Sequence, residues 1–155
     1  MIIIYDQLLM LADENQVQVY EMPMLRRNKG LYLDGVIWVN KFLPSQIEKA
    51  CILSEELGHH FKTVGNILDQ RSIANRKQEK LARVWSYEWV IPLSKIIQAY
   101  THGVRSSWEL AEYIGVTGEF LNEAIVHYQS KYGLMKRVEN YIIYFDPLGV
   151  AEFFE

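Results

Sequence analysis

The chain has little cysteine, little net charge and no long apolar run, and each shortage narrows what it can be. Cys51 is the only cysteine in 155 residues, so an internal disulfide is excluded and a reducing compartment is favoured. The formal net charge of −3 gives no strong attraction to nucleic acid or to an anionic membrane. The apolar N-terminus lacks a basic region, is interrupted by Asp6 and is too short to span a bilayer. We therefore expect a cytoplasmic protein without a signal peptide and without membrane contact.

Apolar and aromatic residues are abundant instead. Half of the residues are hydrophobic and 13% are aromatic, which is enough to build a packed core without disulfides. The length is that of one domain, or of one domain with a small appended lobe. Neither internal repeats nor low-complexity segments interrupt the chain. A compact globular fold follows from this composition.

Periodicity and capping residues predict a mixed α+β fold. The Asp34-Gly35 dipeptide between two short apolar runs predicts a hairpin turn. Ser45, followed three residues later by Glu48, predicts the capped start of a helix. Helices are expected over 3–14, 45–62, 72–90, 93–100, 108–114 and 120–132, and strands over 17–20, 31–33 and 36–40, with 141–145 as a strand or a buried aromatic run.

The helix expected over 45–62 contains Glu55-Glu56-Leu57-Gly58-His59-His60, one residue away from the helical zinc-protease motif H-E-x-x-H. That motif places two metal ligands four residues apart on one helix face, with a general-base Glu after the first ligand. Here Glu55 stands where the first His belongs, and His59 supplies the second ligand. Catalytic zinc sites use three protein ligands, so a third must come from elsewhere.

Glu79 is the candidate third ligand, because it follows His59 by 20 residues on the next predicted helix. Glu56 is then the candidate catalytic base, which takes a proton from the attacking water. Asp69 is a candidate partner for a ligand imidazole, or an ordinary turn acid. His102 and His127 are isolated in sequence, and we interpret both as structural.

Two other interpretations of the same string stay open. Glu56 and His60 have the same spacing, but that frame puts Leu57 where the base should be, so we prefer Glu55 and His59. A helix with this string can also be an ordinary solvated, charged face that binds no metal.

The sequence resembles the ImmA/IrrE family of metallopeptidases from phages and mobile elements. The resemblance is carried by 35–40, 48–61, 79–88 and 90–92, and it covers roughly residues 16 to 95. It implies a zincin-like core over 1–100, with a small hairpin or sheet beside an active-site helix. Residues 101–155 would form a mostly helical C-terminal lobe, or part of one compact domain.

The resemblance also implies a function. It suggests an endopeptidase that cleaves a helix-turn-helix repressor through a metal-activated water, with Zn as the cofactor. The family pattern has His where this chain has Glu55. Two carboxylates and one imidazole form a harder ligand set, which makes Mn or Fe more competitive. The strand formed by Val36, Ile37, Trp38 and Val39 is the candidate substrate edge, pairing with an extended peptide.

Two rival functions remain. A catalytically inactive family member could bind a repressor or another protein without cutting it. Alternatively, residues 110–120 resemble a helix-turn-helix, the motif of a DNA-binding module. The second helix of that motif carries Glu119 and Glu123, which repel phosphate, and lacks an arginine to read guanine. We therefore do not expect direct nucleic-acid binding, and the sequence does not indicate an oligomeric state.

Overall fold

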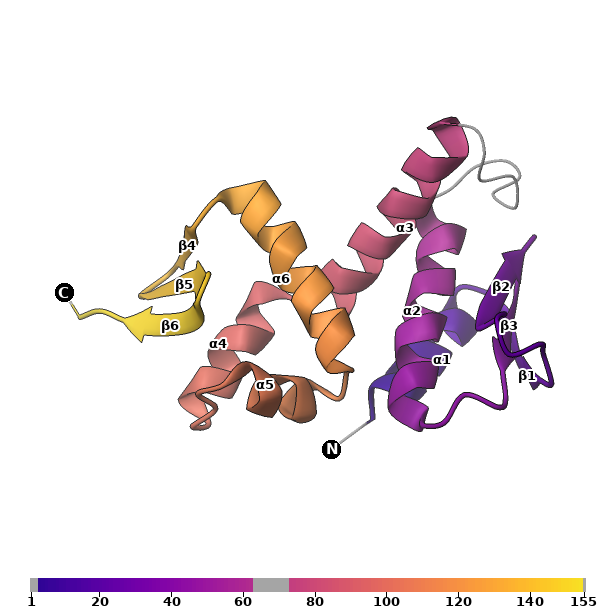
Figure 1. Cartoon of the computed structure of the whole chain (residues 1–155), viewed down its shortest axis with the longest axis horizontal. Helices are drawn as coiled ribbons and strands as arrows, with labels where there is room; N and C mark the ends of the chain where they lie inside the picture. The colour runs from indigo at the N-terminus through magenta and orange to yellow at the C-terminus, as the bar shows by residue number, and fades with distance from the viewer. Residues whose placement is uncertain (1–2, 63–72, 155) are drawn as a thin grey trace. The chain divides into compact units, whose positions relative to one another are not determined.

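The computed structural model describes residues 3–62 and 73–154, and the chain divides into two compact units, residues 1–86 and 87–155 (Figure 1). Each unit contains helices and one three-stranded sheet. Helix α3 (Ile73–Val90) contributes its first part to the first unit and its last turn to the second. The predicted α+β class is confirmed.

The first unit is built around a small mixed sheet. The strand order is β1-β3-β2, with β1 parallel and β2 antiparallel to β3. Its elements are α1 (Ile4–Glu14), β1 (Gln18–Met22), β2 (Gly30–Leu33), β3 (Val36–Asn40), α2 (Gln46–Lys62) and the start of α3.

Local sequence signals explain the boundaries of these elements. Asp34 and Gly35 both have positive φ, 48° and 79°, which closes the β2–β3 hairpin in the twist that the strands require. The Ser45 hydroxyl accepts a hydrogen bond from the Glu48 amide at 3.1 Å, so α2 begins as its cap predicts.

Both α1 and α2 pack on one face of the sheet. Ile37 and Val39 of β3 are fully buried, as are Leu53 and Leu57 of α2, which packs against β2 and β3. Strand side chains alternate between faces, so Val36 and Trp38 point to the opposite side. The α2 helix, which carries the motif, is therefore held against β2 and β3.

The prediction that Val36, Ile37, Trp38 and Val39 form a substrate edge is wrong. These residues belong to β3, which is the central strand and is paired along its length with both β1 and β2. Its backbone N–H and C=O groups are hydrogen-bonded to β1 and β2, so an incoming peptide cannot pair with it. The available edges of this sheet belong to β1 and β2.

Helices α2 and α3 approach closely at a pair of small residues. A Cβ placed on Gly58 would lie 2.2 Å from the Ala82 carbonyl oxygen, closer than any side chain allows. Ala82 and the neighbouring Ser86 are fully buried, and Phe61 contacts Trp85 with ring centroids 5.0 Å apart. Gly58 thus lets the backbone of α3 rest directly on α2.

The second unit has three helices followed by an antiparallel sheet of order β4-β5-β6. The hydroxyls of Ser106 and Thr117 cap the second and third helices. The sequence indicated β5 alone, because β4 and β6 are short and not strongly apolar. The elements are α4 (Leu93–Thr101), α5 (Ser107–Ile114), α6 (Gly118–Tyr132), β4 (Met135–Val138), β5 (Tyr141–Phe145) and β6 (Leu148–Glu152).

Across residues 3–62 and 73–154, no helix combines the length and apolarity that crossing a bilayer requires.

Candidate metal centre

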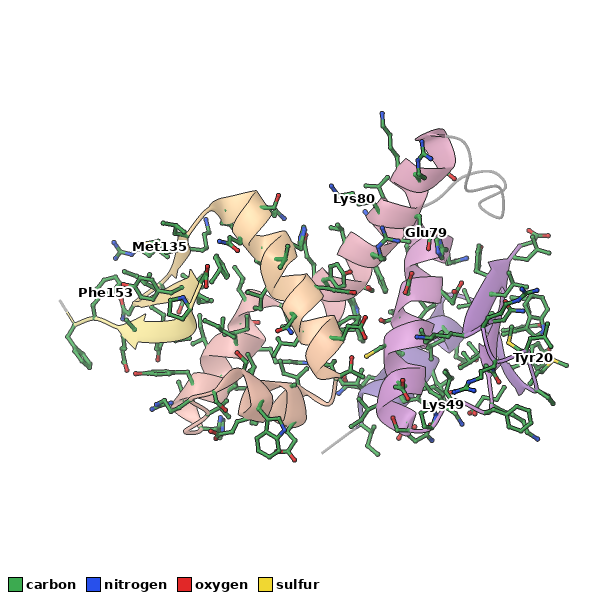
Figure 2. The ribbon with its side chains drawn as sticks, viewed as in Figure 1. Tyr20, Lys49, Glu79, Lys80, Met135 and Phe153 are labelled. Atoms are coloured by element: carbon green, nitrogen blue, oxygen red, sulfur yellow. The ribbon has the colours of Figure 1, made fainter. Side chains whose placement is uncertain are left out.

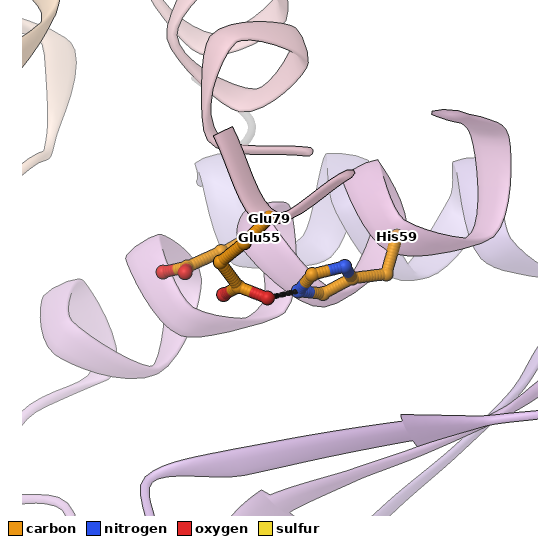
Figure 3. Close-up of side chains that lie close together, drawn as sticks. All are labelled: Glu55, His59 and Glu79. Atoms are coloured by element: carbon orange, nitrogen blue, oxygen red, sulfur yellow. Dashed lines mark ion pairs between the residues drawn. The ribbon is translucent and has the colours of Figure 1, made fainter. Parts of the chain in front are cut away.

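The structure brings Glu55, His59 and Glu79 together (Figure 3). Glu55 and His59 are four residues apart on α2 and share one face, and Glu79 reaches them from α3. One ligand atom from each side chain lies within 4.8 Å of the other two. The His59 Nε2 and a Glu79 carboxylate oxygen are 3.1 Å apart. The close helix crossing at Gly58 makes this approach possible.

The two carboxylates of the cluster share a low-dielectric space. Burial, followed by the charge of Glu79, raises the pKa of Glu55. Burial also acts to raise the pKa of Glu79, but the hydrogen bond from His59 and the charge of His59, followed by the hydrogen bond with Glu55 and the charge of Arg83, outweigh it, so that pKa is lowered. Arg83 Nη1 lies 3.7 Å from the Glu79 carboxylate. Ionising both carboxylates is therefore harder than ionising either one alone, and Glu55 holds its proton more tightly than an exposed carboxyl group does.

His59 is the buried member of the cluster, with only 2% of its surface exposed. Burial lowers its pKa, but the hydrogen bond to Glu79 and the charges of Glu56, Glu79 and Glu55 outweigh this, and the net pKa is raised. The surrounding carboxylates thus favour positive charge at this point of the molecule.

Glu56 extends toward the start of β2. A Cβ on Gly30 would lie 3.2 Å from the Glu56 Cγ and 2.6 Å from the Ile52 Cγ2, so a larger residue there would have to displace one of these side chains. Burial, followed by the negative charges of Glu55 and Glu79, raises the pKa of Glu56 to about 8 against the attraction of His59. Glu56 therefore lies close enough to the cluster to sense its charges.

His60 is held in a hydrogen-bonded position beside the same strand. The Tyr32 hydroxyl and the His60 Nδ1 are 2.8 Å apart, and this hydroxyl also accepts a hydrogen bond from the Gly35 amide. His60 is thus engaged with β2, while His59 faces α3. Among the described residues, the structure brings Glu55 and His59, rather than Glu56 and His60, together with the side chain of Glu79.

The donor set of the cluster fits a divalent cation. Two ligands of one tetrahedral zinc ion lie about 3.4 Å apart, close to the separation of the His59 and Glu79 atoms. One imidazole and two carboxylates are ligands that zinc, manganese and iron all accept. Burial, followed by repulsion from Glu79, raises the pKa of Glu55, and the charge of a bound cation would oppose both effects.

Comparison with protein families agrees with this geometry. The profile of the IrrE N-terminal-like domain, Peptidase_M78, matches residues 12–126. The chain belongs to this family. The matched region contains Glu55, Glu56, His59 and Glu79, and the resemblance seen in the sequence is confirmed. Membership in the IrrE N-terminal-like family makes the chain a metallopeptidase-like protein, and such proteins use a metal. A comparison with curated proteins gave no match.

Other candidate residues of the sequence lie elsewhere. Asp69 falls outside the described residues. His102 and His127 belong to the second unit, where His102 Nδ1 lies 2.7 Å from the Gln98 carbonyl oxygen and His127 Nε2 lies 2.8 Å from a Glu88 carboxylate oxygen. Both contacts fit the structural roles that the sequence indicated.

The local geometry of α5 and α6 matches that of a helix-turn-helix. Helix α5 ends at Gly115 in the left-handed conformation, and α6 begins three residues later. However, Glu119 and Glu123 are exposed on α6, and Lys131 is paired with Glu88 at 3.1 Å. This surface offers acidic groups rather than free cations, and the absence of nucleic-acid binding stays a prediction.

Gly30 and Tyr32 are site neighbours that the sequence did not reveal. Both lie on β2, whose position against α2 depends on how the strands pair. The glycine at the start of an apolar run was the available signal, because a glycine in a strand can mark a close backbone approach.

Proposed function

We propose that the protein is a metal-dependent endopeptidase of a phage or mobile element that cleaves a helix-turn-helix repressor in the cytoplasm. The carrying observation is the Glu55–His59–Glu79 cluster, with Glu56 beside it on α2. The family supports the metallopeptidase part of the proposal. The repressor as substrate rests on the resemblance of the sequence to enzymes of mobile elements.

The chemistry assigns one role to each side chain. Glu55, His59 and Glu79 would hold the cation, with zinc as first choice and manganese or iron as alternatives. The cation, when bound, supplies Lewis acidity to the peptide carbonyl and to the attacking water. Glu56 takes a proton from that water on a carboxylate oxygen and returns it to the leaving amine nitrogen.

Strand β2 is the better candidate for the substrate edge. It lies beside β3 at one border of the sheet, and its first residue, Gly30, packs against Glu56. An extended peptide that adds to β2 would run next to the proposed base. This placement replaces the expectation for the Val36–Val39 segment, since β3 is paired on both sides.

The presence of Glu55 in place of a histidine favours a second candidate function. Glu55 adds a third negative group close to Glu56 and Glu79. A cation bound there is less electrophilic than one in a site with two histidines. A family member that binds its target without cutting it is therefore the alternative, and the same cluster would then have a purely structural role.

Metal analysis and a cleavage assay separate the two functions. The protein is purified without chelator, its metal content is measured, and it is incubated with a candidate helix-turn-helix repressor. Stoichiometric metal in wild type and in Glu56→Gln, with cleavage only by wild type, supports the peptidase. Metal without cleavage supports the binding protein. Wild-type protein that takes up no metal from added Zn²⁺, Mn²⁺ or Fe²⁺ overturns the proposal.

A further inference from the structure

The sheet of the first unit has an apolar face that its helices do not cover. Alternation along the strands puts Ile37 and Val39 on the helix side and the intervening residues on the other side, which we call the outer face. Figure 2 shows Tyr20 on the side of the sheet away from α2. Six apolar side chains lie on the outer face: Tyr20 and Met22 from β1, Leu31 and Leu33 from β2, and Val36 and Trp38 from β3, with the polar Gln18 and Asn40 at its two ends.

None of these six side chains carries a charge. Tyr20, Trp38 and Leu31 lie side by side in one row across the three strands. Tyr20, Met22 and Leu33 are between 46% and 53% exposed, and the other three are partly exposed. A sheet face of this composition is usually covered by another element, and a contiguous apolar surface that stays open marks an interaction site.

One end of the outer face is bordered by a well-ordered loop. The Asn40 side chain, 2% exposed, donates hydrogen bonds to the carbonyl groups of Met24, Leu25 and Asn28 at 2.9 to 3.3 Å. Its carbonyl oxygen accepts a hydrogen bond from the Phe42 amide. Asn40 thereby holds both the 23–29 loop and the turn after β3. Leu25 and Phe42, each more than 60% exposed, extend the apolar surface there.

The same end carries a group of cations. Arg26, Arg27 and Lys29 lie in the loop, and Lys41 lies 5.5 Å from the centre of the Phe42 ring. No ion pair joins any of the four to another residue that the structure describes. The only acid among residues 23–42 is Asp34, at the opposite end of β2. A chain with a net charge of −3 therefore concentrates positive charge beside its exposed apolar sheet face.

We propose that the outer face and its basic loop bind a protein partner through a segment that carries acidic side chains next to apolar ones. The apolar side chains of the segment cover the Tyr20–Trp38–Leu31 row, and its carboxylates meet Arg26, Arg27, Lys29 and Lys41. Tyrosine, tryptophan, methionine and arginine are the residues that protein interfaces favour. The surface lies across the sheet from Glu56, so binding there needs neither metal nor peptide cleavage.

Other occupants fit the surface less well. In a two-fold dimer through this face, the four cations of one copy would lie close to the apolar face or the cations of the other, without matching acids. Single-stranded nucleic acid needs cations along the path of its backbone, whereas here they stand at one end of the sheet. Four of the six apolar side chains on the outer face are aliphatic, which suits a peptide better than stacked bases.

A peptide selection tests the proposal directly. A random dodecapeptide library is selected on immobilised full-length protein in the presence of EDTA, and affinities of the enriched peptides are measured in solution. We expect peptides rich in Asp or Glu beside Leu, Phe or Trp. Arg26→Glu should weaken their binding about tenfold, and Tyr20→Ser by a similar factor. Lys77→Glu, which reverses an exposed charge on α3, is the matched control and should have little effect.

Three outcomes overturn the proposal. The first is enrichment of no peptides, or of peptides without acidic residues. The second is binding that Arg26→Glu and Tyr20→Ser leave unchanged. The third is a different occupant: tighter, salt-dependent binding of oligothymidine at this surface, or self-association in sedimentation that Tyr20→Ser abolishes. Because EDTA is present throughout, failure here leaves the metallopeptidase proposal intact, and loss of metal uptake leaves this one intact.

Discussion

At the candidate metal centre, the charge of each residue depends on the carboxylates around it. Glu55 and Glu56 are neighbours on α2, and Glu79 approaches from α3, so three acids lie around one imidazole. Burial raises the pKa of both Glu55 and Glu56, because water no longer stabilises their ionised forms. The residues that serve the proposed chemistry therefore destabilise the fold when no cation is present.

Replacing Glu56 should make the metal-free protein more stable. In the unfolded chain this carboxyl group ionises near its ordinary pKa of 4.5, and in the folded protein at about 8. Between these values the unfolded chain binds fewer protons than the folded one, so the free energy of unfolding falls as pH rises. Glu56→Gln removes this contribution and should stabilise the protein by roughly 3 kcal/mol at pH 7.

Urea unfolding in EDTA at pH values from 5 to about 8 measures this effect. The gain from Glu56→Gln should be small at the acid end and grow toward the alkaline end. The matched control is Glu14→Gln, at the exposed end of α1. If the variant is equally or less stable at every pH, Glu56 is not held as an uncharged buried acid.

Among the elements, the crossing of α2 and α3 decides whether the ligands can meet. Gly58 lies between Glu55 and His59 on the α2 surface that touches Ala82. In Gly58→Ala the new methyl group would meet the α3 backbone, which cannot turn aside as a side chain can. We expect a loss of about 1–3 kcal/mol in the free energy of unfolding. Zn²⁺ affinity should also fall, because Glu79 moves away with α3.

Thermal unfolding and zinc titration measure both effects in the same variant. Gly118→Ala is the control, since a Cβ at the start of α6 meets nothing within 4 Å. It should leave stability and zinc affinity nearly unchanged. Full zinc affinity in a destabilised Gly58→Ala protein would show that Glu79 does not need this helix crossing to act as a ligand.

Gly30 controls the space between β2 and Glu56. In Gly30→Ala the methyl group meets Ile52 and the Glu56 side chain, so Glu56 must shift. A displaced base should reduce kcat of repressor cleavage by roughly tenfold to a hundredfold. The Ile52→Ala change removes the methyl group that lies nearest, so the double variant isolates the contact with Glu56.

The double variant should fold normally and still have a low kcat. The control is Gly149→Ala in β6, where a Cβ has free space. Wild-type kcat in Gly30→Ala would indicate that Glu56 does not need its present position, and would weaken its role as the base.

How much the sequence predicted depends on whether a signal is local. The Ser45 cap and the Asp34-Gly35 turn each involve residues that are close together in the sequence. Their patterns therefore predicted the start of α2 and the hairpin. Glu79 was also found, because a fixed number of residues separates it from His59. The central position of β3 was not predicted. It depends on the pairing of β3 with β1, a strand that lies before β2 in the sequence.

At the scale of the molecule, proton and metal binding should be linked. The pKa values of Glu55, Glu56 and His59 are all raised, so each group holds its proton up to a higher pH than usual. A divalent cation needs a neutral imidazole and ionised carboxylates, so its binding must expel these protons. Zn²⁺ affinity should therefore rise with pH, by about 1.4 kcal/mol per pH unit for each proton released.

Isothermal titration calorimetry in two buffers with different ionisation enthalpies counts the protons released at pH 6 to about 7. We expect release from wild type and less of it from Glu55→Gln, which has no proton to lose at that position. His59→Ala should lose zinc affinity altogether, while His102→Ala, in the second unit, should retain both affinity and proton release. Zinc binding that releases no protons and survives His59→Ala would place the ion elsewhere. The acids around His59 would then form a structural network. Their mutual repulsion would destabilise the fold, and no bound cation would compensate for it.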